Sequence, residues 1–143
     1  MTADFLFSLV NAAALLGWII LVVGVVLNKP LLRDVIAGRI WPFGLSLFYT
    51  ILVSAFFFKA EGGFDTLVNV QRLFTSPWVA LAGWVHYLTF DLFIGATIAR
   101  DIMKQGLSRL LLVVLLPLTF LFGPIGYFGF VIVRTAFASK ETA

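Results

Sequence analysis

The chain has 143 residues, of which 62% are hydrophobic and only 12% are charged. Soluble domains usually carry about 25% charged residues, so this composition predicts an integral membrane protein that forms one domain over residues 1–143 and has the lipid bilayer as its partner. The absence of cysteine excludes disulfides, thiolate catalysis and Cys-ligated metal sites. The net charge of +3 comes from Lys and Arg spread over helix ends, where they serve as topology signals, so no nucleic-acid partner is expected.

The first apolar segment, residues 5–27, is predicted to be a transmembrane helix, since about 20 mostly apolar residues cross a bilayer. It follows Asp4 rather than a basic region, and its apolar core is longer than that of a signal peptide, so we expect it to stay uncleaved. No Arg- and Ser-rich transit peptide precedes it, which favours a bacterial membrane over a plastid precursor. Asn11 and Trp18 lie on nearly one face of this helix.

A linker and a second spanning helix are expected next. Residues 28–39 carry four charged side chains, and Pro30 disfavours helix in the residue before it, so this stretch is predicted to be the linker. Residues 43–58 are predicted to form the second span. Its polar residues recur at helical spacing and suit interhelical hydrogen bonds, with ligand binding as the alternative; they are Ser46, Tyr49, Thr50 and Ser54.

Residues 64–74 predict a short amphipathic helix between the second and third spans. Eleven residues are too few to cross a bilayer, and the apolar and polar side chains fall on opposite sides, so we expect this helix to lie in the membrane interface. It could instead act as a lid over a cavity that is open to lipid.

The third apolar segment, residues 77–101, carries the most informative side chains. Pro77 suits the first turn of a helix, and the segment is long enough to span. Inside it lie Asp91 and His86, which is the only histidine of the chain. An aspartate near the bilayer centre costs about 2.5–3.5 kcal/mol on insertion scales. The segment is therefore expected to be the functional site, unless both groups simply bond to neighbouring helices.

The spacing of His86 and Asp91 predicts that they lie on different faces of this helix. Five residues correspond to a separation of about 140°, so that His86 falls on the side of Phe90 and Asp91 on the side of Trp84 and Tyr87. A joint role requires a substrate, a water or a third residue between them. Imidazole and carboxylate suit iron or zinc, but the separation argues against a metal site, and no cofactor is expected.

The last apolar segment, residues 107–133, is predicted to be a fourth spanning helix. It contains Pro117 and Pro124 on one face, with glycines nearby. Prolines bend helices and glycines allow close approach, which fits either packing in a bundle or a groove for an extended apolar molecule.

The predicted fold class is an all-α membrane protein, with four transmembrane helices in a bundle and the interfacial helix between the second and third. Four spans place both termini on one side. Six Lys and Arg residues in the two opposite loops, against four on the side of the termini, predict termini outside the cytoplasm of a bacterial cytoplasmic membrane.

The order of these features resembles the abscisic-acid-deficient-four-like family, most strongly over residues 64–134. The combination of W-V-H-x-L-x-x-D-L-F with F-G-P-x-G is fairly specific, whereas either half alone is weak. The matching stretches are residues 73–77 (LFTSP), 84–88 (WVHYL), 91–93 (DLF) and 122–126 (FGPIG), with Arg134 after them and weaker matches at Asn11, Trp18 and Pro30.

The resemblance implies a small four-span protein that acts on carotenoids, or that assists enzymes which do. In plants the related conversion turns violaxanthin into neoxanthin, which opens an epoxide and forms an allene without net redox change. A bacterial relative could use another xanthophyll or another isoprenoid.

Three functions are open on this basis. An acid–base isomerase acting on a functionalised carotenoid end group would use Asp91 as the acid and His86 as the base. A non-catalytic carotenoid-binding or assembly protein, as a homo-oligomer or with other carotenoid enzymes, would use the aromatic groove. A small proton-coupled transporter would use the membrane aspartate. The expected substrate-binding residues are Asn11, Trp84, Tyr87, Phe90, Gly123, Pro124 and Gly126.

Overall fold

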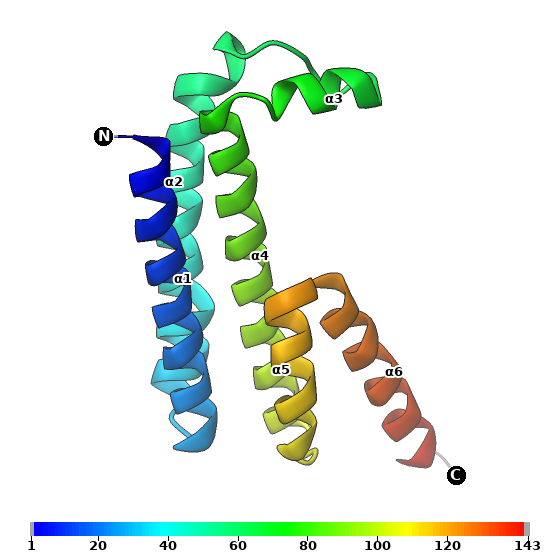
Figure 1. The fold of residues 1–143 in the computed structure, drawn as a ribbon. Coiled ribbons are helices and arrows are strands. Elements are labelled where there is room, and N and C mark those ends of the chain that lie inside the picture. Colours follow the sequence, from blue (N-terminus) through cyan, green and yellow to red (C-terminus); the bar gives the residue numbers. More distant parts are fainter. Residues whose placement is uncertain (1, 142–143) are drawn as a thin grey trace.

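The computed structural model describes residues 2–141, and every regular element in that range is helical (Figure 1). Three stretches are long and apolar enough to cross a membrane. The first is α1 (Ala3–Val26) and the third is α4 (Pro77–Lys104). The second runs from Leu31 to Lys59, and it consists of three joined elements, η1 (Leu31–Ile40), α2 (Trp41–Phe56) and η2 (Phe57–Lys59).

Helix α4 is the centre of the molecule, because it contacts α1, η1, α2, α5 and α6. Its side chains are correspondingly buried, with Leu92 and Ile98 fully inaccessible. The outer surfaces of the surrounding helices are apolar instead; Phe43 of α2 is 72% exposed. Such a surface is unfavourable in water and suits contact with lipid. Helices of spanning length are therefore confirmed at the predicted spans 5–27 and 77–101, and the predicted span 43–58 lies within a longer helical stretch, Leu31–Lys59.

The predicted linker over residues 28–39 is wrong, because most of it is the helix η1. Two of the four charges of this stretch are paired within the helix, where the Arg33 guanidinium donates from Nε and Nη2 to the two carboxylate oxygens of Asp34, both at 2.7 Å. Gly24 of α1 lets η1 pack closely, since a Cβ there would lie 2.6 Å from the backbone nitrogen of Arg33. Paired charge and close packing thus allow a charged segment to be part of the bundle.

The predicted single helix over residues 107–133 is also wrong, since the segment forms two helices, α5 (Leu110–Phe122) and α6 (Pro124–Glu141). The break falls at Gly123, which has φ +38°. Proline lacks an N–H and disfavours helix in the residue before it, so Pro124 ends α5 and starts α6. The two helices form a hairpin whose tip lies beside the middle of α4 (Figure 1).

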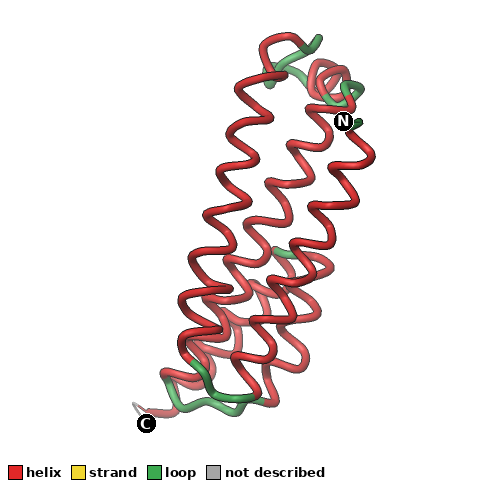
Figure 2. The backbone as a smooth tube through the Cα atoms, turned by 90° about the vertical axis from the view of Figure 1, so that its left-hand side faces the viewer, coloured by secondary structure: helices red, strands yellow, loops and turns green. Residues whose placement is uncertain are grey.

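This hairpin changes the predicted topology. Helix α1 begins at one end of the bundle and α6 ends at the other (Figures 1 and 2), whereas a four-span bundle would have brought the two ends to one side. The physical reason is the reversal of the chain at Gly123. The segment expected to cross once instead forms two antiparallel helices, α5 and α6. The short helix predicted over residues 64–74 is observed as α3 (Leu67–Leu73), lying across one end of the bundle (Figure 1).

Candidate functional site

Asp91 lies near the middle of α4, about 20 Å from either helix end at a rise of 1.5 Å per residue. Its side chain is buried, with only 5% of the residue exposed. Among residues 2–141, the Oδ2 atom of Asp91 has no hydrogen-bond partner although it is inaccessible. Buried polar atoms are nearly always paired, so this oxygen is an acceptor that a ligand or a proton can satisfy.

The carboxylate of Asp91 lies directly against the break between α5 and α6. A Cβ at Gly123 would overlap with the Oδ1 atom of Asp91, so only glycine fits this position as it stands. The positive φ of Gly123 favours glycine as well. The end of α5 and the start of α6 leave backbone groups without helical partners, and such irregular backbone is tolerated at membrane depth only where protein or a cavity surrounds it.

Tyr87 lies one turn before Asp91 on the same face of α4 and bonds to the broken helix. Its hydroxyl donates to the carbonyl of Leu121 at 2.8 Å, which satisfies one of the free carbonyls at the end of α5. The same hydroxyl is near enough to the Asp91 carboxylate to interact with it. Tyr87 therefore connects the acid to the hairpin tip.

The line of polar contacts continues from Tyr87 towards α1. The indole of Trp84 stacks on the ring of Tyr87, with centroids 5.3 Å apart, and its Nε1 donates to the side-chain oxygen of Asn11 at 2.7 Å. One face of α4 thus carries Trp84, Tyr87 and Asp91 in a row. These three residues and Asn11 of α1 make four predicted site residues that the fold brings together.

A second aromatic contact lies one turn of α4 after Asp91. The Trp18 ring packs so closely on Gly95, one turn after Asp91, that a Cβ there would overlap with the indole. Trp18 also makes an edge-to-face contact with Phe120 of α5, with ring centroids 5.4 Å apart. The aromatic pair therefore lies in the seam of α1 with α5, one turn of α4 after Asp91.

Pro124 and Gly126, which were also predicted as site residues, help to form the hairpin of α5 and α6. Pro124 is the first residue of α6. Gly126 packs on α5 so tightly that a Cβ would overlap with the hydroxyl of Thr119, which is itself buried and donates to the Leu115 carbonyl. These two residues shape the hairpin that holds Gly123 against Asp91.

His86 faces a different seam, formed by α4 with α2 and α3. Its imidazole makes an edge-to-face contact with the ring of Tyr49, at a centroid distance of 5.4 Å, and contacts Phe90 at 4.7 Å. His86 and Tyr49 line a pocket of about 480 Å³. The prediction that His86 and Asp91 lie on different faces is confirmed, and within residues 2–141 no group of three or more His, Cys, Asp or Glu side chains is arranged to hold a metal ion.

Two contacts of these sites were not anticipated from the sequence. Tyr49 was included only in a polar stripe with three hydroxyl residues, and its pairing with His86 depends on how α2 packs against α4. The helix break at Gly123 could have been predicted locally, because a Gly-Pro pair favours the end of a helix.

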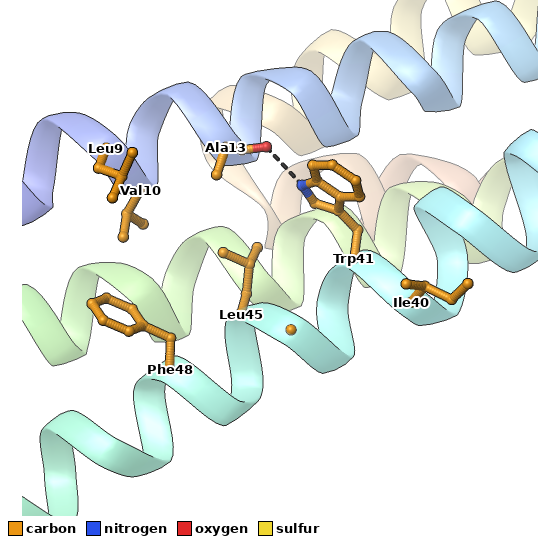
Figure 3. A pocket seen from close by; sticks show the side chains of 8 residues that line it. Leu9, Val10, Ala13, Ile40, Trp41, Leu45 and Phe48 are labelled. Carbon is orange, nitrogen blue, oxygen red and sulfur yellow. Dashed lines mark hydrogen bonds between the residues drawn. The ribbon is translucent and has the colours of Figure 1, made fainter.

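A further hollow between α1 and η1–α2 contrasts with these sites (Figure 3). Its volume is about 400 Å³, and the side chains around it are apolar except for the indole nitrogen of Trp41. That nitrogen already donates to the carbonyl of Ala13 at 2.7 Å. Nothing in this hollow is left to recognise a polar group.

The comparisons with known proteins agree with the resemblance seen in the sequence. A family model described as ABA DEFICIENT 4-like matches residues 5–130, which is most of the chain. No curated protein matches the chain, and no solved structure does. On the strength of the family match, this chain belongs to the ABA DEFICIENT 4-like family.

Proposed function

We propose that the protein is an isomerase of a bacterial cytoplasmic membrane that acts on an oxygenated carotenoid, within the carotenoid- or xanthophyll-related role that its family indicates. The observation that carries this proposal is the carboxyl group of Asp91, buried at mid-helix with one oxygen unpartnered and placed against a break in the backbone. An ionisable side chain at such depth is a functional-site candidate by default.

The reaction is the opening of an epoxide on a carotenoid ring. The Asp91 carboxyl donates its proton to the epoxide oxygen while one ring C–O bond breaks, which leaves a hydroxyl group. Its second oxygen takes a proton from the neighbouring vinylic carbon, and the electron pair of that C–H bond forms the new double bond of an allene. The carboxyl ends with one proton as it began, so atoms and electrons balance without an oxidant.

Asp91 performs both proton transfers, because His86 lies on another face of α4 and cannot contact the same substrate ring. His86 packs on Tyr49 of α2, whereas Asp91 faces Gly123 of the hairpin. A protonated carboxyl group carries a donor and an acceptor on its two oxygens, which matches an isomerisation that moves protons between neighbouring atoms. Tyr87 acts as the orienting hydrogen-bond partner.

The substrate chain lies in the seam between α1 and α5. Two adjoining hollows of about 340 and 530 Å³ share Val22, Leu116 and Pro117. They extend from the aromatic pair, Trp18 and Phe120, to Ser108 and Arg109 at the end of the bundle; the lining is otherwise apolar. An extended hydrocarbon there would place an oxygenated ring beside Trp18, which packs on Gly95 one turn after Asp91, and the aromatic pair would have to move for the ring to reach the carboxyl.

The test is conversion of an epoxidised xanthophyll by purified protein in lipid nanodiscs. We expect Asp91→Asn to lower the rate at least about a hundredfold, since acid–base groups contribute about 10²–10⁴, without loss of folded protein. Asp101→Asn is the matched control, because Asp101 lies near the helix end, 3.9 Å from the Arg100 guanidinium. Full activity of Asp91→Asn would overturn the proposal.

A non-catalytic carotenoid-binding protein is the second candidate, favoured by the apolar seam of α1 with α5. Binding without catalysis predicts that wild-type protein retains the pigment and returns it chemically unchanged after incubation. The same chromatographic separation of pigments distinguishes the two functions.

A further inference from the structure

We infer that the pocket between α2, α3 and α4 is a second ligand site, which binds an oxygen-bearing six-membered ring carried on an isoprenoid chain. It is separate from Asp91 and does not depend on the proposed isomerase activity. Its volume of about 480 Å³ falls within the range of about 300–1,000 Å³ that is typical of small-molecule sites.

The lining of the pocket is aromatic, which suits a flat or cyclic ligand. Phe57 and Phe64 stack with ring centroids 5.3 Å apart, and Phe74 adds a third ring from the end of α3. Gly83 of α4 leaves room for the Phe74 ring, since a Cβ at Gly83 would lie 2.6 Å from that ring. The neighbouring residue Leu73 is buried and fixes α3 as one wall of the pocket.

Two polar groups in this lining have no hydrogen-bond partner in the part of the chain that the structure describes. Among residues 2–141, no hydrogen bond reaches the ring nitrogens of His86 or the hydroxyl of Tyr49; the two rings contact each other only edge to face. His86 lies about 14 Å along α4 from Pro77, at 1.5 Å per residue, and is exposed on the protein surface. An imidazole facing hydrocarbon is unfavourable, so a ligand that covers and bonds to it is favoured.

The charge of the site selects a neutral ligand. The side chains that line the pocket include no Lys, Arg, Asp or Glu, so the phosphate of a phospholipid or a fatty-acid carboxylate would be buried without a counter-ion. A hydroxyl or carbonyl oxygen satisfies His86 or Tyr49 without adding charge. An isoprenoid tail would leave the pocket past Phe58, which is 86% exposed at its rim.

Two sources share this chemistry, the hydroxylated end ring of a carotenoid and the headgroup of a membrane quinone. Equilibrium binding to protein in nanodiscs distinguishes them with three probes: zeaxanthin, its hydrocarbon counterpart β-carotene, and decylubiquinone. Saturable binding of zeaxanthin assigns the site to carotenoid rings, and saturable binding of decylubiquinone assigns it to quinones. Wild-type protein is expected to prefer the bound probe over β-carotene by about tenfold, as one hydrogen bond allows.

The variant that tests the pocket is His86→Phe, which keeps an aromatic ring and removes both nitrogens. It should abolish the preference for the oxygenated ring while β-carotene binding stays unchanged, and His86→Gln should restore part of the preference. Phe93→Leu, a lipid-facing change on the same helix, should have no effect. Asp91→Asn should leave this binding intact even if it stops conversion, so the two proposals fail separately. Unchanged preference in His86→Phe, or its loss in Asp91→Asn, would overturn the inference.

Discussion

The two faces of α4 differ in what their polar groups contact. On one face, Trp84, Tyr87 and the buried Asp91 form a row of contacts that ends at the backbone of Gly123. On the other face, His86 lies among aromatic rings, and within residues 2–141 it makes no hydrogen bond. The first face is organised by neighbouring helices, whereas the second is left open to a ligand.

The difference shows how one helix can serve two seams. A turn of 3.6 residues sends side chains five apart in opposing directions, so neighbours in sequence have different partners. The Asp91 face depends on the hairpin, because Gly123 brings irregular backbone to the middle of α4. The His86 face depends on α2 and on the position of α3 across the end of the bundle. The following changes test this separation.

The largest effect is expected for Gly123→Ala. The substitution forces a residue with a Cβ into a positive-φ conformation and pushes that atom into the Asp91 carboxylate. We expect the free energy of unfolding to fall by about 2 kcal/mol or more, measured by SDS titration in mixed micelles. Gly44→Ala is the control, because nothing lies within 4 Å of a Cβ there; equal losses in both variants would contradict the role given to Gly123.

A smaller effect is expected for Tyr87→Phe, which removes the donor to the Leu121 carbonyl. An interhelical hydrogen bond in a membrane protein contributes about 0.6 kcal/mol on average, up to about 1.7, so unfolding should become easier by about that amount. The rate of xanthophyll conversion should fall more than the affinity for the xanthophyll does, because the substitution also removes a hydroxyl that interacts with Asp91. Tyr127→Phe, on the exposed surface of α6, should leave both quantities as they were.

Asn11→Leu tests the contact of α1 with Trp84, at the end of the row that begins at Asp91. It leaves the Trp84 indole N–H without its acceptor, which should lower the free energy of unfolding by about 0.6 kcal/mol. A double-mutant cycle with Trp84→Phe should return a coupling energy of that size. A coupling energy of zero would mean that the 2.7 Å contact does not contribute to stability.

The smallest effect is expected for the coupling between the two faces. Because His86 and Asp91 share no contact, the changes in unfolding free energy of His86→Phe and Asp91→Asn should add within about 0.3–0.5 kcal/mol. A larger coupling energy in the double variant would show that the two faces are energetically coupled and would support a joint site of His86 and Asp91.

Much of this architecture could be predicted from the sequence, but the hairpin could not. Apolar length predicted the spanning helices, and the five-residue spacing separated His86 from Asp91. The charge of residues 28–39 suggested a linker, since the pairing of Arg33 with Asp34 in a helix cannot be read from composition. Residues 107–133 have spanning length, and only their packing shows that the chain reverses at Gly123.

The sequence by itself determined that this chain forms apolar helices long enough to cross a membrane and which face of its central helix each polar group occupies, because hydrophobic length and helical phase are local properties. The tertiary structure alone decided what those faces meet. The contact of Asp91 with Gly123 joins residues 32 positions apart, and the pairing of His86 with Tyr49 joins residues 37 apart. Such contacts depend on how helices pack across the bundle, which no local pattern specifies.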